Sequence, residues 1–326
     1  MNNANISSAN GTAPLLGTVE QGVCVSIVVP VYNAADTLCA CIDSLLCQTH
    51  TALDIVLVDD GSPDESGRIC DECAKHDPRI HVVHQTNQGR SVARWVGTQQ
   101  ARGVWLTYVD ADDQLMSDAI ERLLHAATDD TDIVLGNARS CGWGTGTVPI
   151  DEFRHAAVRS DGTIGVPWGS LYRRSALNAR LFDVPRDIYN GEDYLFWLRL
   201  VFQTSKPVRT LADSVYLKGE EHTSNSFRWT SDYSYRLNAL RMESIPADVR
   251  ADYLSDTIND RMTNLYATTL HEPRRQWSTH PFYTEILRDM QLLGREFTFG
   301  QRFFLNLPSR RLRRLWSEVY QAIILP

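Results

Sequence analysis

Long apolar runs and positive charge are both scarce in this sequence. No stretch approaches the roughly 18 apolar residues that a membrane-spanning helix needs, and residues 1–22 lack the basic start and apolar core of a signal peptide. We therefore expect residues 1–22 to be a flexible leader. Lysine and arginine number 32 against 40 aspartates and glutamates, a formal net charge of -8 that argues against nucleic acid as a partner. These absences predict a cytoplasmic protein, either free or peripheral on the inner face of the plasma membrane.

Cysteine is too scattered for a disulfide framework. The seven cysteines are an odd number in a mid-sized chain, which favours a reducing compartment. Cys70 and Cys73 have the spacing of a redox or zinc half-site, but no second CxxC follows, and we interpret them as ordinary helix residues. The phosphate-binding signatures GxGxxG and GKS/T are missing too, so the charge of a bound phosphate would have to be handled by a metal.

Short apolar runs rich in β-branched residues alternate with amphipathic stretches from residue 25 onward. This alternation predicts right-handed βαβ units and a Rossmann-like, mostly parallel α/β sheet with helices on both faces. The predicted strands are VSIVVPV from Val25, DIVLVDD from Asp54, RIHVVHQ from Arg79, VWLTYVDADD from Val104 and DIVLG from Asp132. In such sheets the ligand lies beyond the carboxyl ends of the strands.

The pattern also predicts how the chain is divided. We expect a main α/β domain over residues 23–228, with a first half of about 23–136 and a second half of about 137–228. Residues 137–165 are glycine-rich and weakly periodic, which favours a mobile connection near the site. The pattern is helical toward the end, so a helical C-terminal region is expected over residues 229–326.

Polar residues follow three of the predicted strands directly. They are Pro30, Tyr32 and Asn33 after the first, Asp59, Asp60, Gly61 and Ser62 after the second, and Asp110, Asp112 and Asp113 after the fourth. Carboxylates gathered along one sheet edge repel one another, and a bridging cation relieves that repulsion. A carboxylate of the VDDGS turn can accept a hydrogen bond from uracil or ribose; the alternative is an ordinary Asp-Gly turn before a helix.

The DADD motif at Asp110 brings two carboxylates to the same side of a strand end. Hard oxygen ligands of this kind suit Mg²⁺ or Mn²⁺ and leave coordination positions open for phosphate oxygens. The alternative is an acidic loop that caps the helix near Ser117.

Two further motifs lie at predicted helix starts. In NQGRSVAR, Gly89 opens a helix on which Arg90 and Arg94 lie one turn apart, a combination that favours a diphosphate. A solvated helix face is the alternative. In GEDYLFWLRL, Glu192 and Asp193 begin an amphipathic helix, where acids also simply favour the helix dipole.

Taken together, these motifs resemble a known family. PVYN at Pro30, DDGS at Asp59, GRSVAR at Gly89, DADD at Asp110, WGSLYRRSAL at Trp168 and GEDYLFW at Gly191 occur in one order. The set resembles the bacterial family 2 glycosyltransferases of GT-A fold over roughly residues 24–225, and it is far more specific than any one motif.

The resemblance implies that residues 23–228 are the catalytic domain, with the nucleotide half at about 23–136 and the acceptor half at about 137–228. It also implies a role for each matching residue. Asp193 is implied as the catalytic base, with Trp168 and Glu192 on the acceptor side. Gly169 and Ser170 depart from the polar residues common beside that tryptophan. The residues implied to bind the donor are Pro30, Tyr32, Asn33, Asp59, Asp60, Arg94, Asp110, Ala111 and Asp112. Asp112 is implied to hold the metal, which His222 would complete unless it is a surface-loop histidine.

The predicted function is that of an inverting glycosyltransferase. It would move a sugar from a nucleotide diphosphate sugar, with UDP preferred because the DDGS pattern resembles UDP-using members, to a hydroxyl of a glycan or lipid-linked saccharide in cell-surface polysaccharide synthesis. Mn²⁺ or Mg²⁺ is the expected cofactor. The alternatives are an Asp-dependent phosphatase, which usually carries its Asp-x-Asp after the first strand, and a non-catalytic module that binds sugar nucleotides or glycans.

The end of the chain is a basic amphipathic helix. Its arginines (Arg310, Arg311, Arg313 and Arg314) stand beside its apolar residues (Leu312, Leu315 and Trp316). Such a helix can lie on an anionic lipid surface, which predicts peripheral membrane contact. The alternative is a helix packed on its own domain.

Overall fold

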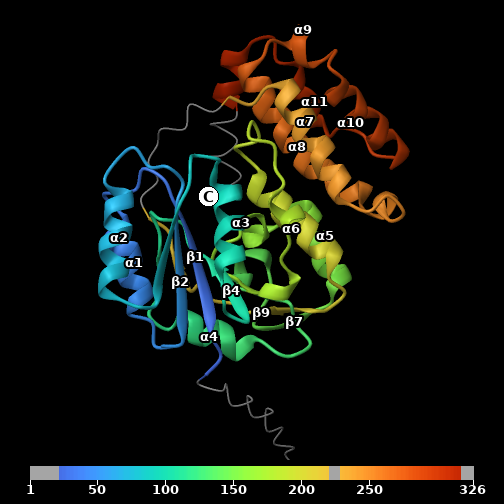
Figure 1. Cartoon of the computed structure of the whole chain (residues 1–326). Coiled ribbons are helices and arrows are strands. Elements are labelled where there is room, and N and C mark those ends of the chain that lie inside the picture. Colours follow the sequence, from blue (N-terminus) through green and yellow to red (C-terminus); the bar gives the residue numbers. More distant parts are fainter. Residues whose placement is uncertain (1–21, 220–227, 317–326) are drawn as a thin grey trace, which may run out of the picture.

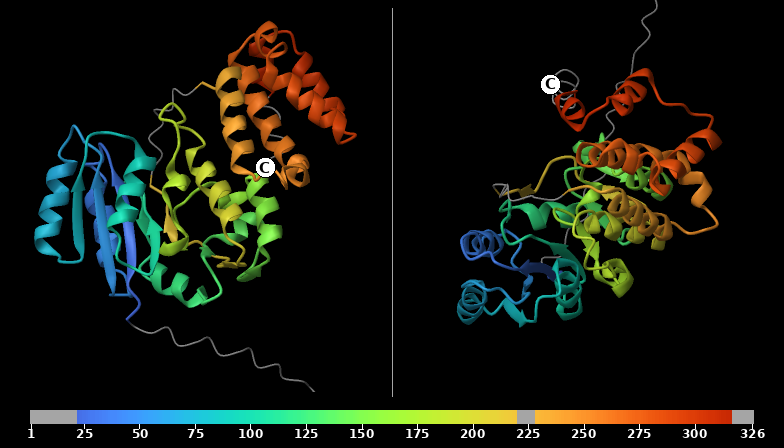
Figure 2. Two further views of the ribbon diagram at one scale, coloured as in Figure 1. Left: turned by 45° about the vertical axis from the view of Figure 1, so that its right-hand side comes forward. Right: turned by 90° about the horizontal axis from the view of Figure 1, so that it is seen from above.

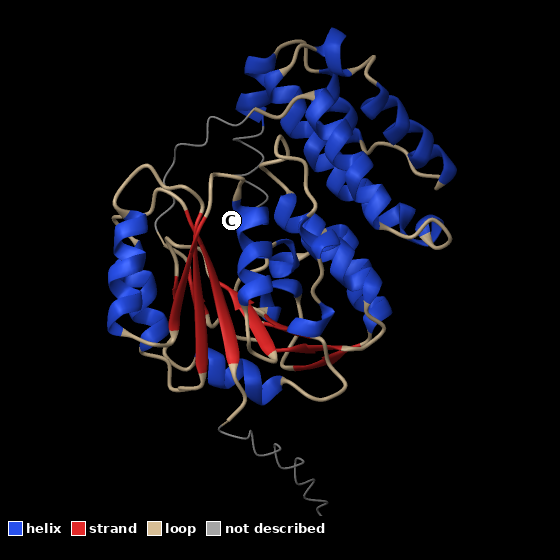
Figure 3. Cartoon of the chain, viewed as in Figure 1, coloured by secondary structure: helices blue, strands red, loops and turns tan. Residues whose placement is uncertain are grey.

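The computed structural model describes residues 22–219 and 228–316. Its centre is a mostly parallel, eight-stranded sheet with the strand order β3-β2-β1-β4-β8-β6-β9-β7 (Figures 1 and 3). Helices cover both faces of this sheet, and a group of helices follows at the C-terminal end. The α/β architecture expected from the sequence is therefore confirmed.

The first half of the sheet consists of the four parallel strands that the apolar runs predict. They are β1 (Val25–Val31), β2 (Leu53–Asp59), β3 (Ile80–His84) and β4 (Trp105–Tyr108). The helices of this half are α1 (Leu38–Leu46), α2 (Ser66–His76), α3 (Arg90–Gln100) and α4 (Ala119–Ala126). Cys70 and Cys73 both lie on α2, as ordinary helix residues. β1 and β2 are rich in apolar residues and buried along almost their whole length, because helices cover them on both faces.

Alternation along β1 divides the core into two layers. Ile27 and Val29 face α1 and α4, whereas Val28 faces α3 and the second half of the domain. α3 lies close to the sheet because Gly97 has no side chain, and a Cβ there would overlap the side chain of Val28. This close approach brings the arginines of α3 toward the carboxyl edge of the sheet.

The second half of the sheet is mixed. Its strands are β8 (Leu171–Arg173), β6 (Ile133–Leu135), β9 (Val208–Thr210) and β7 (Gly146–Val148). β8 runs antiparallel to both of its neighbours, and β7 is antiparallel to β9. A second, two-stranded sheet pairs β5 (Gln114–Leu115) with β10 (Tyr216–Leu217).

Residues 137–165 are more regular than the sequence analysis expects. Besides β7 they contain α5 (Ile150–Arg159), a ten-residue helix. Phe153, Ala156 and Ala157 of α5 are buried in the sheet core against α6 (Glu192–Gln203). The glycines obscured this pattern, because they lie at both ends of the segment while the apolar helix face lies between them. The sequence analysis therefore missed α5, and the expectation of a mobile connection near the site stays a prediction.

The C-terminal region is helical, as predicted. Its helices are α7 (Ser231–Ser244), α8 (Leu254–His271), α9 (Arg274–Trp277), α10 (Pro281–Leu292) and α11 (Phe299–Asn306). They stand beside the sheet domain as a separate group with its own core around Leu265, Trp277 and Ile286, and α7 packs against α6 (Figure 2). No helix within the described residues is long and apolar enough to cross a membrane.

The basic tail is only partly as the sequence predicts. Residues 310–316 are helical, and the rest of the tail lies outside the described residues. Arg313 is buried and donates hydrogen bonds to the carbonyl oxygens of Thr269, Leu307 and Glu272. For Arg313 the alternative of a side chain packed on its own domain therefore holds, whereas the expected membrane contact of the tail stays a prediction.

Candidate active site

The first two motifs meet at the carboxyl edge of the sheet. Val31 at the end of β1 is paired with Asp59 at the end of β2. Just beyond, Asn33 adopts a left-handed backbone with φ of 52°, and its N–H donates to Ser62 Oγ at 3.3 Å. Tyr32 points into solvent with 52% of its surface exposed. This edge therefore carries an exposed aromatic ring beside the DDGS turn. Pro30, the last but one residue of β1, is partly buried.

Asp59 is buried at this edge in a polar setting. Its carboxylate accepts the Ser62 N–H at 3.0 Å and faces Nδ1 of His84 at 2.9 Å. Burial opposes ionisation of Asp59, but the hydrogen bonds from Ser62 and His84 outweigh it and lower its pKa. Hydrogen bonds to Asp59 and Asp71 raise the pKa of His84. The sequence analysis missed His84, which nothing but its place at the end of a strand marks.

Asp60 has a different environment from its neighbour. It is buried, and its two oxygens accept the side-chain amide of Gln85 and the backbone N–H groups of Gln88 and Gly89. Three donors at 2.7 to 2.8 Å tie the loop before α3 to the end of β2. In the structure the Asp60 carboxylate therefore binds backbone and side-chain N–H groups of the loop before α3. Its donor-binding role stays a prediction.

The three acids of DADD point into three environments. Asp110 is partly buried beside Arg94, and Asp113 is buried, where its carboxylate accepts hydrogen bonds from the Tyr216 hydroxyl and the Gly219 N–H. Burial raises the pKa of Asp113. Asp112 is exposed and makes no hydrogen bond or ion pair within residues 22–219 and 228–316. Of the three carboxylates, that of Asp112 is the one available to a ligand from solvent.

Ala111, between the two acids of the DxD pair, is buried. Its carbonyl oxygen accepts a hydrogen bond from the Thr37 hydroxyl at 3.0 Å. This bond fixes the turn to the segment before α1, so the acids on either side of Ala111 point in different directions.

One arginine joins the DADD motif to the GEDYLFW motif. The guanidinium of Arg94 is buried, with Nη2 2.8 Å from Asp110 and Nη1 2.5 Å from Asp193. Burial opposes the charge of Arg94, but the two carboxylates outweigh that effect and raise its pKa. Asp193, 99 residues from Arg94 in the sequence, and Asp110, 16 residues from it, therefore bind the same guanidinium. The sequence analysis placed Arg94 near the nucleotide and did not foresee this bridge.

A second ion pair lies one turn earlier on α3. Arg90, which is half exposed, pairs with the buried carboxylate of Glu192. Burial and the neighbouring charge of Asp193 raise the pKa of Glu192. Glu192 therefore faces α3, and its predicted acceptor contact stays a prediction.

Trp168 lies on the other side of Asp110. Its ring stacks on that of Tyr216, with centroids 4.3 Å apart and planes within 15°. The Tyr216 hydroxyl also accepts the Asp110 N–H at 3.1 Å, so this ring buttresses the DxD turn. Gly169 follows with φ of 69°, and a Cβ there would press on Tyr216. Tyr216 carries no sequence motif, and only the fold reveals its place in the site.

The predicted metal site is only partly visible. His222 lies outside the described residues, and no group of three or more His, Cys, Asp or Glu side chains within the described ranges is arranged to hold an ion by itself. Asp112 remains as an exposed carboxylate beside the DxD turn.

With this geometry in place, the comparisons with known proteins are decisive. The model of the family described as Glycosyl transferase family 2 matches residues 26–191, which run from β1 to the turn before Glu192. The chain belongs to glycosyl transferase family 2. Membership of this family supports a glycosyltransferase, and it favours sugar transfer over the Asp-dependent phosphatase and the non-catalytic binding module.

Curated relatives support the same assignment. The uncharacterized glycosyltransferase EpsJ of Bacillus subtilis (strain 168) is 34% identical over 218 residues, which cover 61% of this chain and 62% of EpsJ. The uncharacterized glycosyltransferase YibD of Escherichia coli (strain K12) is 29% identical over 278 residues, which cover 84% of this chain and 72% of YibD. The match with EpsJ leaves more than a third of that protein outside it.

Solved structures show the GT-A fold. S. aureus TarS has a TM-score of 0.60 at 17% identity, with 84% of this chain and 93% of the TarS chain covered. The mannosyltransferase PcManGT from Pyrobaculum calidifontis, solved with GDP-Man and Mn²⁺, has a TM-score of 0.52 at 17% identity, with 92% and 86% covered. A structure of TarS in complex with UDP-GlcNAc is similar as well, with a TM-score of 0.59 at 18% identity.

Proposed function

We propose that this family 2 glycosyltransferase moves a sugar from a UDP-sugar to a hydroxyl of a glycan or lipid-linked saccharide, with inversion at the anomeric carbon. The observation that carries the proposal is the Arg94 guanidinium, which holds Asp110 of the DxD pair and Asp193 of the ED motif together. An inverting transfer needs a base opposite the departing diphosphate, and this arrangement holds the proposed base, Asp193, beside the first acid of the DxD pair. Cell-surface polysaccharide synthesis is the proposed setting.

The donor side of the proposal rests on the carboxyl edge of β1, β2 and β4. Tyr32 offers an exposed ring for the base, and the partly buried Pro30 and the exposed Asn33 lie beside it in the sequence. Asp59 is held ionised by its partners, so it can accept hydrogen bonds from uracil or ribose. That TarS was solved with UDP-GlcNAc supports UDP as the nucleotide.

A divalent ion, Mn²⁺ or Mg²⁺, is part of the proposal. Asp112 suits it, because such ions are often held by one or two carboxylates while diphosphate oxygens and water complete the shell. Arg94 forms its ion pairs with Asp110 and Asp193. The exposed carboxylate of Asp112 therefore has no cationic partner within the described residues and can bind a metal ion. When bound, the ion stabilises the charge that develops on the departing diphosphate. The presence of Mn²⁺ in the PcManGT structure supports a metal in this chain.

Asp193 is the proposed catalytic base. As the acceptor oxygen bonds to the anomeric carbon, the bond from that carbon to the diphosphate oxygen breaks, and the hydroxyl proton passes to the Asp193 carboxylate. Such a proton transfer contributes about 10² to 10⁴ in rate. Arg94 fixes the direction of this carboxylate, and the side chain of Asp193 remains 18% exposed for an incoming hydroxyl.

The acceptor side is proposed from Trp168 and Glu192. Trp168 is partly exposed, but Tyr216 covers one face of its ring, which leaves the other face for a sugar. Glu192 adjoins the base and is turned toward Arg90, so its contribution is to hold the start of α6.

Peripheral membrane contact is proposed through the outer end of the C-terminal region. Exposed apolar side chains gather there, namely Leu292, Phe299, Phe303, Leu315 and Trp316. Arg311 lies among them, exposed. Apolar and basic groups together fit the interface of an anionic bilayer, which would hold the enzyme at the inner face of the plasma membrane.

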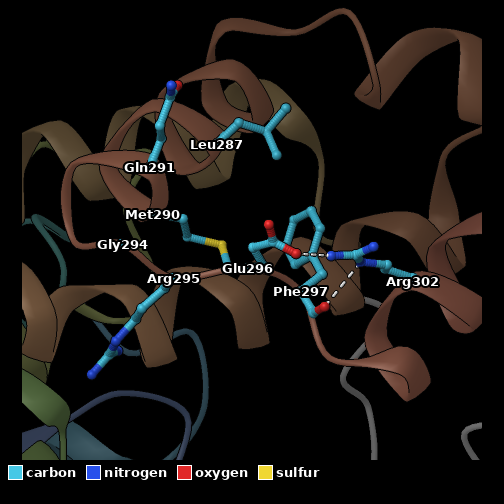
Figure 4. Close-up of a pocket in the computed structure, with 8 residues that line it drawn as sticks. All are labelled: Leu287, Met290, Gln291, Gly294, Arg295, Glu296, Phe297 and Arg302. Carbon is cyan, nitrogen blue, oxygen red and sulfur yellow. Dashed lines mark hydrogen bonds and ion pairs between the residues drawn. The ribbon is translucent and has the colours of Figure 1, made fainter.

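A hollow of about 490 Å³ opens in the same region, between α10 and α11 (Figure 4). Met290 and Phe297 line it, and Arg302 at one side is paired with Glu296. None of its lining residues is a predicted site residue, so the hollow has no part in the proposed sugar transfer.

The decisive experiment is a screen of purified enzyme against UDP-, GDP- and dTDP-sugars for hydrolysis and transfer, with Mn²⁺ and with chelator. UDP-sugar turnover that chelator abolishes is expected, and NMR of the product would show the inverted anomer. Binding of no nucleotide sugar in either condition would end the proposal.

Membrane contact has its own test. Co-sedimentation with phosphatidylglycerol vesicles is compared for the full chain and for a Phe299→Ser, Phe303→Ser variant. Less variant should pellet, and equal binding by the two proteins would end the membrane idea.

A further inference from the structure

Tyr189 is an exposed aromatic ring close to the proposed base. It is 59% exposed, more than any other large hydrophobic side chain recorded as exposed within residues 22–219. Only three residues separate it from Asp193 along the chain. A single exposed tyrosine needs no explanation by itself, but this one lies on a backbone that is held from two sides.

The first side is α3. Nη2 of Arg90 donates to the carbonyl oxygen of Tyr189 at 3.3 Å, and the same side chain pairs with Glu192. Three residues before Tyr189, Arg186 donates to the side-chain oxygen of Asn87 at 2.7 Å. The turn before α6 is thus tied to the loop and helix of the nucleotide half.

The second side is α7 of the C-terminal region. The Tyr233 hydroxyl donates to the Asn190 carbonyl oxygen at 2.7 Å and accepts the Asn190 N–H at 2.9 Å. Leu237 packs against Gly191, whose φ of 100° turns the chain into α6. The turn that carries Tyr189 is therefore fixed, although Tyr189 itself is 59% exposed.

Two further aromatic rings accompany Tyr189. Its centroid lies 6.0 Å from that of Tyr233, which in turn lies 5.6 Å from that of Trp229. Fixed aromatic rings next to a reacting centre present flat faces to which the apolar C–H faces of sugar rings bind. These residues come from the acceptor half and from the helical region beyond it.

We propose that Tyr189, backed by Tyr233 and Trp229, is a stacking platform for a pyranose ring of the acceptor saccharide. The proposal rests on the proposed function, since it takes Asp193 as the base that receives the acceptor proton. The platform aligns the sugar so that its hydroxyl meets Asp193, and it gives the C-terminal region a part in acceptor binding through α7.

The test compares Tyr189→Ala and Tyr189→Phe with the wild-type enzyme. Tyr235→Ala is the matched control, because Tyr235 is an exposed tyrosine whose ring lies against His280. Binding of methyl glucopyranosides, galactopyranosides and N-acetylglucosaminides is followed by tryptophan fluorescence. In parallel, the acceptor KM, the donor KM and acceptor-free donor hydrolysis are measured with whichever UDP-sugar the enzyme uses.

Loss of the ring should weaken glycoside binding and raise the acceptor KM by about tenfold, the scale of one aromatic contact. Donor KM and hydrolysis should stay unchanged, and the Tyr189→Phe and Tyr235→Ala proteins should match the wild type. Unchanged glycoside binding in Tyr189→Ala would overturn the platform, as would a change confined to the donor KM. Glycoside binding that depends on Tyr189, in a protein that turns over no donor, would support the platform and refute the proposed transfer.

Discussion

The Asp193 carboxylate lies 2.5 Å from Nη1 of Arg94, on a guanidinium whose Nη2 lies 2.8 Å from Asp110. Arg94 is buried between two carboxylates that come from different halves of the domain. Arg94 therefore links the position of the proposed base, Asp193, to that of Asp110 in the DxD pair. We expect a substitution at either carboxylate to shift the other.

Arg94→Lys should lower transfer far more than donor affinity. A lysine is a single point charge that cannot serve two carboxylates with a planar fork, so Asp193 would lose its alignment. Misplacement of a reacting group by about 1 Å costs about 10²-fold in rate. Steady-state kinetics would show this fall in kcat with a nearly unchanged donor KM. Arg102→Lys, at the far end of α3, serves as the control, and a loss shared by both variants would contradict the assignment.

Asp193→Asn should abolish transfer and leave nucleotide binding intact. The amide keeps the shape of the side chain but cannot take the acceptor proton, so we expect kcat to fall by about 10² to 10⁴. Stopped assays of transfer, with calorimetric titration of UDP, separate the two properties. Asp183→Asn, an exposed acid nearby in the sequence, should behave as the wild type. Full activity in Asp193→Asn would remove this residue from the mechanism.

Asp112→Asn should weaken the response to metal. Because Asp112 is the exposed carboxylate of the DxD turn, we expect the Mn²⁺ concentration for half-maximal activity to rise by about tenfold or more. Chelator should abolish the wild-type activity. Asp118→Asn, five residues after the last acid of the DADD motif, is a control that should leave the metal titration unchanged. Identical titrations for all three proteins would place the ion elsewhere.

Asp60→Ala should destabilise the fold. Removal of this buried carboxylate leaves three N–H donors without an acceptor. We expect this loss to lower the free energy of unfolding by about 3 kcal/mol. Urea unfolding measures the change, and Asp60→Asn should lose less because its amide oxygen still accepts. An Asp60→Ala protein of wild-type stability that fails to bind UDP would show instead that this carboxylate serves the nucleotide.

The Asp59 and His84 pair should make stability depend on pH. The pKa of His84 is raised above 6.5 in the folded protein. The stabilisation of the fold by protonated His84 is therefore complete below pH 6.5, and it is lost as the pH rises through the raised pKa. The pKa of Asp59 is lowered below 3.8, so its contribution holds above that pH and is lost on acidification through the lowered value. Between these limits the pair stabilises the fold.

His84→Gln should accordingly lower the Tm most near pH 5.5. His84 is about half exposed, so the expected loss is only about 1 to 2 °C there and smaller at pH 8.5. Thermal unfolding at the two pH values gives the comparison. A loss that is equal at both would mean that packing, and not charge, links the two residues.

The sequence was most informative where structure is local. Apolar runs such as that at Val25 predict buried strands because a strand covered on both faces has no polar side. The acids that follow β2 and β4 reach the same edge because parallel strands share their direction. Helix α5, within residues 137–165, was missed because the flanking glycines hid its apolar face.

What the sequence by itself determined is the family, the parallel half of the sheet and the acids at its edge, because each is written in adjacent residues. Only the tertiary structure decided how those residues are partnered. Arg94 bridges two carboxylates, Asp60 turns inward to its own chain, and Tyr216 supports Asp110 from 106 residues away. Such partners are chosen by packing between distant segments, and no local pattern of residue types records that choice.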